Sequence, residues 1–112
     1  MNLKRWAIIN HQFEGLHNYP DAQGEQKYLS HLHRHLFKIT IWLEQFHDDR
    51  DIEYLDFLNW LKSICPSGDL KNTSCEQLAI NFIDQVQKKY PDRQVKVRVM
   101  EDGENGSFIE TQ

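Results

Sequence analysis

The sequence predicts a single α+β domain, in which a four-stranded antiparallel sheet carries two helices on one face. Two observations support this fold class. Apolar residues alternate with polar ones near both ends of the chain, as in half-buried strands, and they recur every three or four residues in the middle, as in amphipathic helices. The 112 residues are enough for one domain, taken as residues 1–112, and too few for two.

The first part of the chain is expected to form two strands. Residues 5–13 contain several large apolar side chains and predict the first strand. Residues 33–43 predict the second strand, because apolar side chains occupy most of the odd positions and polar ones most of the even positions. The connection, residues 18–30, contains a proline and a glycine. It is long for a hairpin, and long loops in small domains often carry function.

The middle of the chain is expected to form the helices, over residues 51–64 and 75–90. Their apolar faces comprise Tyr54, Phe57, Leu58, Leu61 and Cys65 in the first helix, and Cys75, Leu78, Ala79, Phe82, Ile83, Val86 and Tyr90 in the second. A proline follows each helix and ends it. Thr73 and Glu76 have capping-box spacing, so we expect Glu76 to be a helix cap rather than a catalytic group.

The last part of the chain is expected to form two further strands. Residues 95–100 alternate valine with longer side chains and predict the third strand, and residues 107–111 predict the fourth. An Asp-Gly pair and an Asn-Gly pair between them are turn signals. The predicted element order is therefore strand, strand, helix, helix, strand, strand. Such a sheet leaves at least one edge open, and an open edge favours pairing with another subunit.

Composition excludes several classes of protein. Lys and Arg number 13 against 17 Asp and Glu, which gives a net charge of -4 and argues against a nucleic-acid binder. No apolar run approaches the roughly 20 residues of a membrane span. The apolar stretch after Lys4 and Arg5 ends at Asn10, which is too short for a signal peptide. Cys65 and Cys75 are too few for a disulfide framework, so we expect a cytoplasmic protein with reduced thiols.

Two of the six histidines predict a metal site. His33 and His35 lie two residues apart on a predicted strand, so their imidazoles point to the same face, about 7 Å apart along the chain. This spacing allows both to bind one ion. Zinc accepts nitrogen ligands in tetrahedral geometry, and catalytic zinc sites often have three protein ligands. The alternative interpretation is a histidine pair at the surface or packed within the strand.

The third ligand has several candidates. His17 follows the first predicted strand and lies beside the pair if the two strands form a hairpin. His11 and His31 are also close in sequence, and His31 has the parity of His33. The sequence alone does not decide which of these histidines is the third ligand. His47 lies at the strand-to-helix turn and is expected to be solvated.

Short segments along the chain match a known pattern. They are Phe13-Glu14-Gly15-Leu16-His17, Leu32-His33-Arg34-His35-Leu36-Phe37, Leu55-Asp56-Phe57, Asn72-Thr73-Ser74-Cys75-Glu76-Gln77-Leu78-Ala79 and Val99-Met100-Glu101. In this order, and over about residues 7–110, the chain resembles the 6-pyruvoyl-tetrahydropterin synthase and 6-carboxytetrahydropterin synthase family.

The resemblance implies a T-fold, in which two hairpins flank a pair of antiparallel helices. Subunits of that family assemble into trimers whose sheets close a barrel, often stacked as hexamers, with active sites between subunits. The resemblance makes His17, His33 and His35 zinc ligands and Glu101 the residue that holds the pterin ring. It implies a homotrimer or homohexamer that uses a pterin such as 7,8-dihydroneopterin triphosphate. An active member would be a zinc-dependent carbon–oxygen or carbon–carbon lyase.

The chain departs from the family pattern at the proton-transferring residues. The family carries a cysteine four residues before the first histidine of the pair, where this chain has Leu29. Its Asp–His relay between the helices is absent, and Asp69 is the only acid left in that connection. Arg34 replaces the glycine between the paired histidines. Proton transfer between carbons requires a base within hydrogen-bonding distance, so these departures affect catalysis more than binding.

Three hypotheses follow. The chain is a zinc-dependent lyase with a substitute base, for which Glu25, His31 and Asp69 are candidates. Alternatively, it binds zinc and a pterin without the usual turnover. In the third hypothesis it is an assembly subunit whose histidines only pack.

Overall fold

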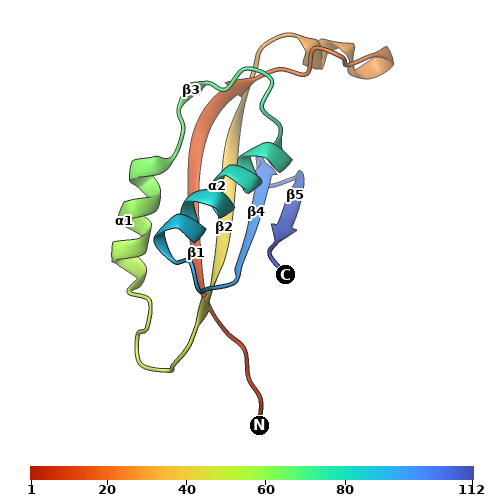
Figure 1. Cartoon of the computed structure of the whole chain (residues 1–112). Helices are drawn as coiled ribbons and strands as arrows, with labels where there is room; N and C mark the ends of the chain where they lie inside the picture. The colour runs from red at the N-terminus through yellow and green to blue at the C-terminus, as the bar shows by residue number, and fades with distance from the viewer.

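The computed structural model describes residues 1–112 and has an α+β fold (Figure 1). A five-stranded mixed sheet has the strand order β3-β1-β2-β4-β5. The elements are β1 (Arg5–His17), the 3-10 helix η1 (Gly24–Ser30), β2 (His33–Gln45), α1 (Tyr54–Ile64), β3 (Gly68–Asp69), α2 (Cys75–Lys89), β4 (Val95–Glu101) and β5 (Asn105–Glu110). None of the helices has the length and apolar character that a membrane crossing requires.

The α+β class is confirmed, but the predicted count of four antiparallel strands is wrong. The additional strand, β3, has two residues and runs parallel to the end of β1, pairing Gly68 with Gly15 and Asp69 with Leu16. Two residues are too few to show an alternation of apolar and polar side chains, so the sequence pattern could not indicate this strand.

The β1–β2 hairpin is longer than predicted and dominates the sheet. It is antiparallel and paired without a bulge from Arg5 opposite Gln45 to His17 opposite His33. Strand β2 then pairs with β4, and β4 pairs with β5 across a tight turn. The connection from β1 to β2, which includes η1, projects beyond the end of the sheet (Figure 1).

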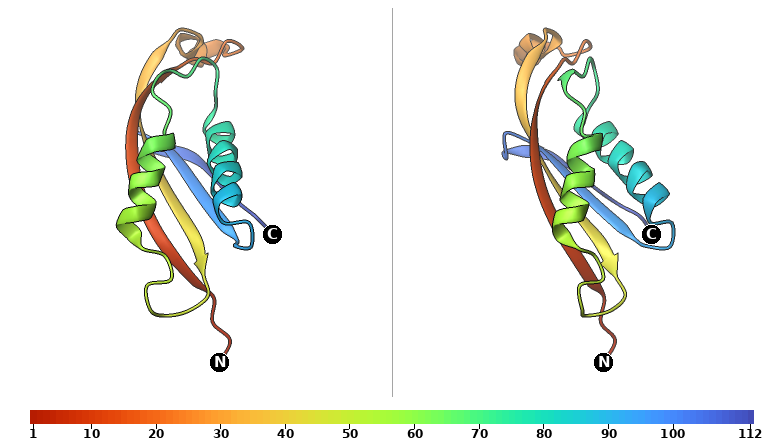
Figure 2. Two further views of the ribbon diagram at one scale, coloured as in Figure 1. Left: turned by 60° about the vertical axis from the view of Figure 1, so that its left-hand side comes forward. Right: turned by 90° about the vertical axis from the view of Figure 1, so that its left-hand side faces the viewer.

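The core lies between one face of the sheet and the two α-helices, which both cover that face (Figure 2). The odd positions of β2 and β4 point into it, as their alternation predicts. The fully buried large side chains include Phe37 and Ile41 from the sheet and Phe57, Leu61 and Phe82 from the helices. The predicted faces of both helices are largely confirmed, because these apolar stripes fill the core.

Both helices begin where a side chain caps them, and the one cap that the sequence predicted, at the second helix, is displaced. Glu53 caps α1 by accepting the backbone N–H groups of Leu55 and Asp56, so the helix starts three residues later than predicted and Tyr54 remains exposed. In α2, the capping box is formed by Ser74 and Gln77. The expected box of Thr73 and Glu76 is therefore wrong by one residue, because Ser74 is the residue with non-helical backbone at this end.

An ion pair anchors the loop between β2 and α1 to the end of the sheet. Arg93 donates to both carboxylate oxygens of Asp51, at 2.6 and 3.1 Å, and the Phe46 backbone N–H donates to the same carboxylate at 2.7 Å. The side chain of Asp51 is 8% exposed. The hydrogen bonds from Arg93 and from the Phe46 N–H lower the pKa of Asp51 from 3.8 to about 2.

This ion pair predicts a pH-dependent contribution to stability. Because the folded-state pKa of Asp51 lies below its ordinary value, its contribution is complete above the ordinary value and is lost as the pH falls toward 2. We expect Asp51→Asn to lower the free energy of unfolding at neutral pH, and this deficit to shrink in acid. Urea unfolding at both pH values measures it. The control is Asp49→Asn, at a carboxylate 87% exposed; an Asp51→Asn deficit independent of pH would contradict the prediction.

Candidate metal centre

Three histidines meet at the end of the sheet where β1 stops and β2 begins. The hairpin register places His17 directly opposite His33, and His35 points to the same face because it lies two residues further along β2. The ring centroids are 4.6 to 5.2 Å apart, and one nitrogen of each ring lies within 4.8 Å of the others. The predicted convergence is confirmed: this triad lies close enough to hold a metal ion.

The Nδ1 atom of each histidine faces an oxygen acceptor. The contacts run from His17 to the Thr73 carbonyl at 3.0 Å, from His33 to the His31 carbonyl at 2.9 Å, and from His35 to the Asp102 carboxylate at 2.6 Å. Carbonyl and carboxylate oxygens accept hydrogen bonds, so Nδ1 carries the proton in each ring. In the neutral rings, the Nε2 atoms then carry lone pairs available to a metal.

The groups around the Nε2 atoms fit a cation. His35 Nε2 is buried and has no hydrogen-bond partner. Glu101 lies beside it, with Oε2 at 3.3 Å from His35 Nε2 and Oε1 at 3.5 Å from His17 Nε2. Lone pairs and a carboxylate so close together repel one another unless a positive charge lies among them. The donor set of His17, His33 and His35 therefore suits a metal ion.

Asp102 orients the triad and was missed as a site residue by the sequence analysis. Its Oδ1 accepts the Leu36 backbone N–H at 2.9 Å while Oδ2 accepts His35 Nδ1–H, and these two hydrogen bonds lower the pKa of Asp102. The sequence indicated only a turn at Asp102-Gly103. Asp102 does open that turn, with a left-handed φ of 55°. One residue thus begins the β4–β5 turn and orients the His35 ring.

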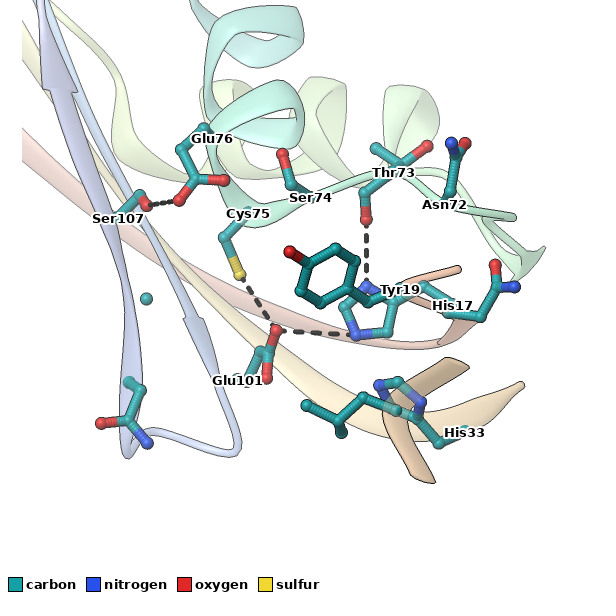
Figure 3. Close-up of a pocket in the computed structure, with 14 residues that line it drawn as sticks. His17, Tyr19, His33, Asn72, Thr73, Ser74, Cys75, Glu76, Glu101 and Ser107 are labelled. Atoms are coloured by element: carbon teal, nitrogen blue, oxygen red, sulfur yellow. Dashed lines mark hydrogen bonds and ion pairs between the residues drawn. The ribbon is translucent and has the colours of Figure 1, made fainter. Parts of the chain in front are cut away.

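A cavity of about 440 Å³ lies next to the triad (Figure 3). Its lining comes from the end of β1 and the residues after it, η1, the start of β2, the segment that leads into α2, the start of α2, the end of β4 and the start of β5. The lining residues are His17, Asn18, Tyr19, Leu29, His33, Asn72, Thr73, Ser74, Cys75, Glu76, Glu101, Asn105, Gly106 and Ser107. A cavity of this size accommodates a small molecule.

Glu101 links the triad to the wall of the cavity formed by α2. Figure 3 shows it between Cys75 and His17. The Cys75 Sγ lies 3.7 Å from Glu101 Oε1, and burial, with the nearby Glu101 carboxylate, raises the pKa of this thiol to about 12. Cys75 is buried as predicted, but it faces the cavity as well as the core. Cys65 is half-buried against the core, and burial raises its pKa to about 11.

Glu76 lies in the first turn of α2 and accepts a hydrogen bond from the Ser107 hydroxyl at 2.7 Å. This bond, with others from the start of the helix, lowers the pKa of Glu76. Glu76 therefore stays ionised beside the cavity and joins α2 to β5.

The candidate bases do not reach this cavity. Glu25 lies exposed in η1, and the exposed Asp69 in β3 accepts the Lys71 backbone N–H at 2.7 Å. His31 is exposed and contributes its backbone carbonyl to His33. None of the three lines the cavity, whereas Leu29, at the position where the resemblance expects a cysteine, does.

No protein-family model matches this chain, and no curated protein matches it.

Replacing Asp102 tests how the triad is oriented. Asp102→Asn keeps the shape of the side chain and tolerates a left-handed backbone, but it weakens the hydrogen bond that orients His35. We expect a roughly 10–100-fold loss of divalent-metal affinity, as is typical for partners of metal-binding histidines. Competition with a chromophoric chelator measures it. Glu104→Gln, in the same turn, is the control and should bind metal normally; unchanged affinity in Asp102→Asn would contradict the account.

Proposed function

We propose that this chain is a zinc protein that binds or acts on a pterin, similar to the 6-pyruvoyl- and 6-carboxytetrahydropterin synthases. The observation that carries the proposal is the set of three Nε2 atoms, each with its Nδ1 facing an acceptor, at the edge of a cavity that also contains Glu101. Three imidazole nitrogens are a suitable ligand set for zinc, and they leave the fourth coordination position open for a bound small molecule.

The pterin part of the proposal is supported by Glu101. Its carboxylate is one-third exposed and faces the cavity, where it can accept N–H groups from the edge of an amino-substituted ring. The ring would then extend toward the α2 wall, with the hydroxylated side chain near the triad. Bound zinc supplies Lewis acidity to such hydroxyls. The lining residues hold and orient the ligand.

Among the hypotheses, binding without the usual turnover is favoured by the titratable groups of the cavity. Leu29 supplies no thiol, and the raised pKa of Cys75 keeps that thiol protonated. Glu76 is hydrogen-bonded to Ser107. Glu101 remains as the one carboxylate beside both the triad and the cavity, and an active lyase would have to use it as its base.

The proposal includes assembly into a homotrimer or homohexamer of the T-fold type. Strand β5 forms one edge of the sheet. The sheet face opposite the helices carries Ile8, 55% exposed, and a Trp42–Phe108 pair with ring centroids 5.7 Å apart. A neighbouring subunit on this edge and face would pair the free backbone groups and bury the apolar side chains.

Zinc-dependent pterin binding tests the proposed function. We expect the zinc-loaded protein to bind 7,8-dihydroneopterin in calorimetry and the chelator-treated protein not to bind it. Glu101→Gln should keep the zinc and lose most of the pterin affinity, because an amide presents one acceptor and a donor in place of two acceptors. His33→Ala should lose both, while His47→Ala, at a residue remote from the cavity, should lose neither.

The same variants separate the alternatives. Loss of zinc in Glu101→Gln would show that Glu101 is a metal ligand rather than the residue that binds the pterin ring. A wild-type protein that takes up no zinc, with stability unaffected by His33→Ala, would contradict the proposal and leave the assembly hypothesis. Release of a two-carbon aldehyde from the bound pterin would mark a lyase, and unchanged ligand would mark a binding protein.

The proposed assembly can be tested independently of zinc and pterin binding. We expect light scattering of the purified protein to give three or six times the 13.4 kDa chain mass. Adding a charge at the open face, as in Phe108→Glu, should shift the mass toward the single chain. A wild-type monomer at high protein concentration would contradict barrel closure without affecting the metal site.

A further inference from the structure

We infer that the cavity selects an uncharged, hydroxyl-rich ligand over its phosphorylated form. This inference rests on the proposed function and narrows it: the pterin that binds here carries a free hydroxylated side chain rather than a triphosphate. Three features of the lining carry it, namely its charge, the use already made of the α2 N-terminus, and the direction of the nearby cations.

Among the charged residue types, the cavity lining contains two carboxylates and no basic side chain apart from its histidines. None of the fourteen lining residues is Lys or Arg, whereas Glu76 and Glu101 both are lining residues. A divalent ion at the triad would be balanced by these two carboxylates, so the part of the lining that this chain supplies offers no net positive charge to a polyphosphate. Sites that bind phosphate groups usually supply Arg, Lys or unpaired backbone N–H groups.

The start of α2 is the feature that could otherwise attract an anion, and the chain satisfies it internally. The Ser74 hydroxyl accepts the Gln77 backbone N–H at 3.2 Å, and the Gln77 side chain accepts the Ser74 N–H at 2.9 Å. Glu76 places a carboxylate in the first turn and is held there by Ser107 at 2.7 Å. The favourable position for a negative charge at this helix end is therefore occupied by Glu76.

The cations nearest in sequence are directed elsewhere or lie outside the lining. Arg34 separates the two histidines of β2, points to the opposite face of the sheet and approaches Glu14 at 3.4 Å. Lys71 precedes the lining residue Asn72 but is itself exposed and outside the lining. Neither is among the residues that line the cavity.

The uncharged lining groups match a polyhydroxylated ligand. Asn72 and Asn105 offer amides, and Ser74 and Ser107 offer hydroxyls, on the walls around the triad. Amides and hydroxyls both donate and accept, as the hydroxyls of a sugar-like side chain do. With Glu101 accepting from N–H groups, these amides and hydroxyls are complementary to a neutral, hydroxyl-rich molecule.

The test compares two ligands on the zinc-loaded full chain. Calorimetry is expected to give an affinity for 7,8-dihydroneopterin at least about tenfold higher than for 7,8-dihydroneopterin triphosphate, with the difference shrinking as salt is added. Glu76→Gln keeps an acceptor for the Ser107 hydroxyl and removes the negative charge. It should therefore reduce the difference in affinity between 7,8-dihydroneopterin and its triphosphate. The control is Lys71→Gln, which should leave both affinities unchanged.

Each outcome decides the question. Equal affinities, or tighter binding of the triphosphate, would overturn the inference and leave the proposed pterin site standing. A loss of triphosphate binding in Lys71→Gln would also overturn it, because that lysine would then serve the phosphates. If neither ligand binds the zinc-loaded protein, the proposed function fails and the inference fails with it.

Discussion

The register of the β1–β2 hairpin is the constraint on which the site depends. Thirteen-residue strands pair from one end to the other without a bulge, and the last pair is His17 with His33. A shift by one residue would turn His35 and Phe37 to the opposite face together. The apolar residues of β2 that fill the core therefore also hold the imidazoles in place: the burial of Phe37, Ile39 and Ile41 specifies the register that the metal site requires.

The oxygen atoms that accept hydrogen bonds from the three imidazoles come from three different connecting segments. These segments therefore meet at the histidine triad. His31 belongs to the projecting connection, Thr73 to the segment before α2, and Asp102 to the β4–β5 turn. Strand β3 has a role in this arrangement despite its length, because its pairing with β1 leads the chain toward Thr73 beside His17. Metal binding at the triad would thus restrain these connections together, and loss of the metal would loosen all three.

The sequence predicted the parts of this structure that follow from periodicity. The alternation in β2 and β4, the helical stripes of α1 and α2, and the shared face of His33 and His35 required only the residue pattern. Asp102 could not be recognised as a partner of His35, because 67 residues separate them and the contact depends on the β2–β4 pairing. Strand β3 and the exact caps were missed because they depend on single backbone conformations. Cys75 was recognised as buried, but its contact with Glu101 is a tertiary feature.

The proposed site combines two carboxylates of the cavity with a cation that the three imidazoles would hold, so that the negative and positive charges would offset one another. X-ray absorption of the zinc-loaded protein tests its central element most directly. The account predicts three imidazole nitrogens at about 2.0–2.1 Å from zinc, with a fourth light-atom ligand. A zinc environment with fewer than three imidazoles, or with oxygen ligands alone, would contradict it.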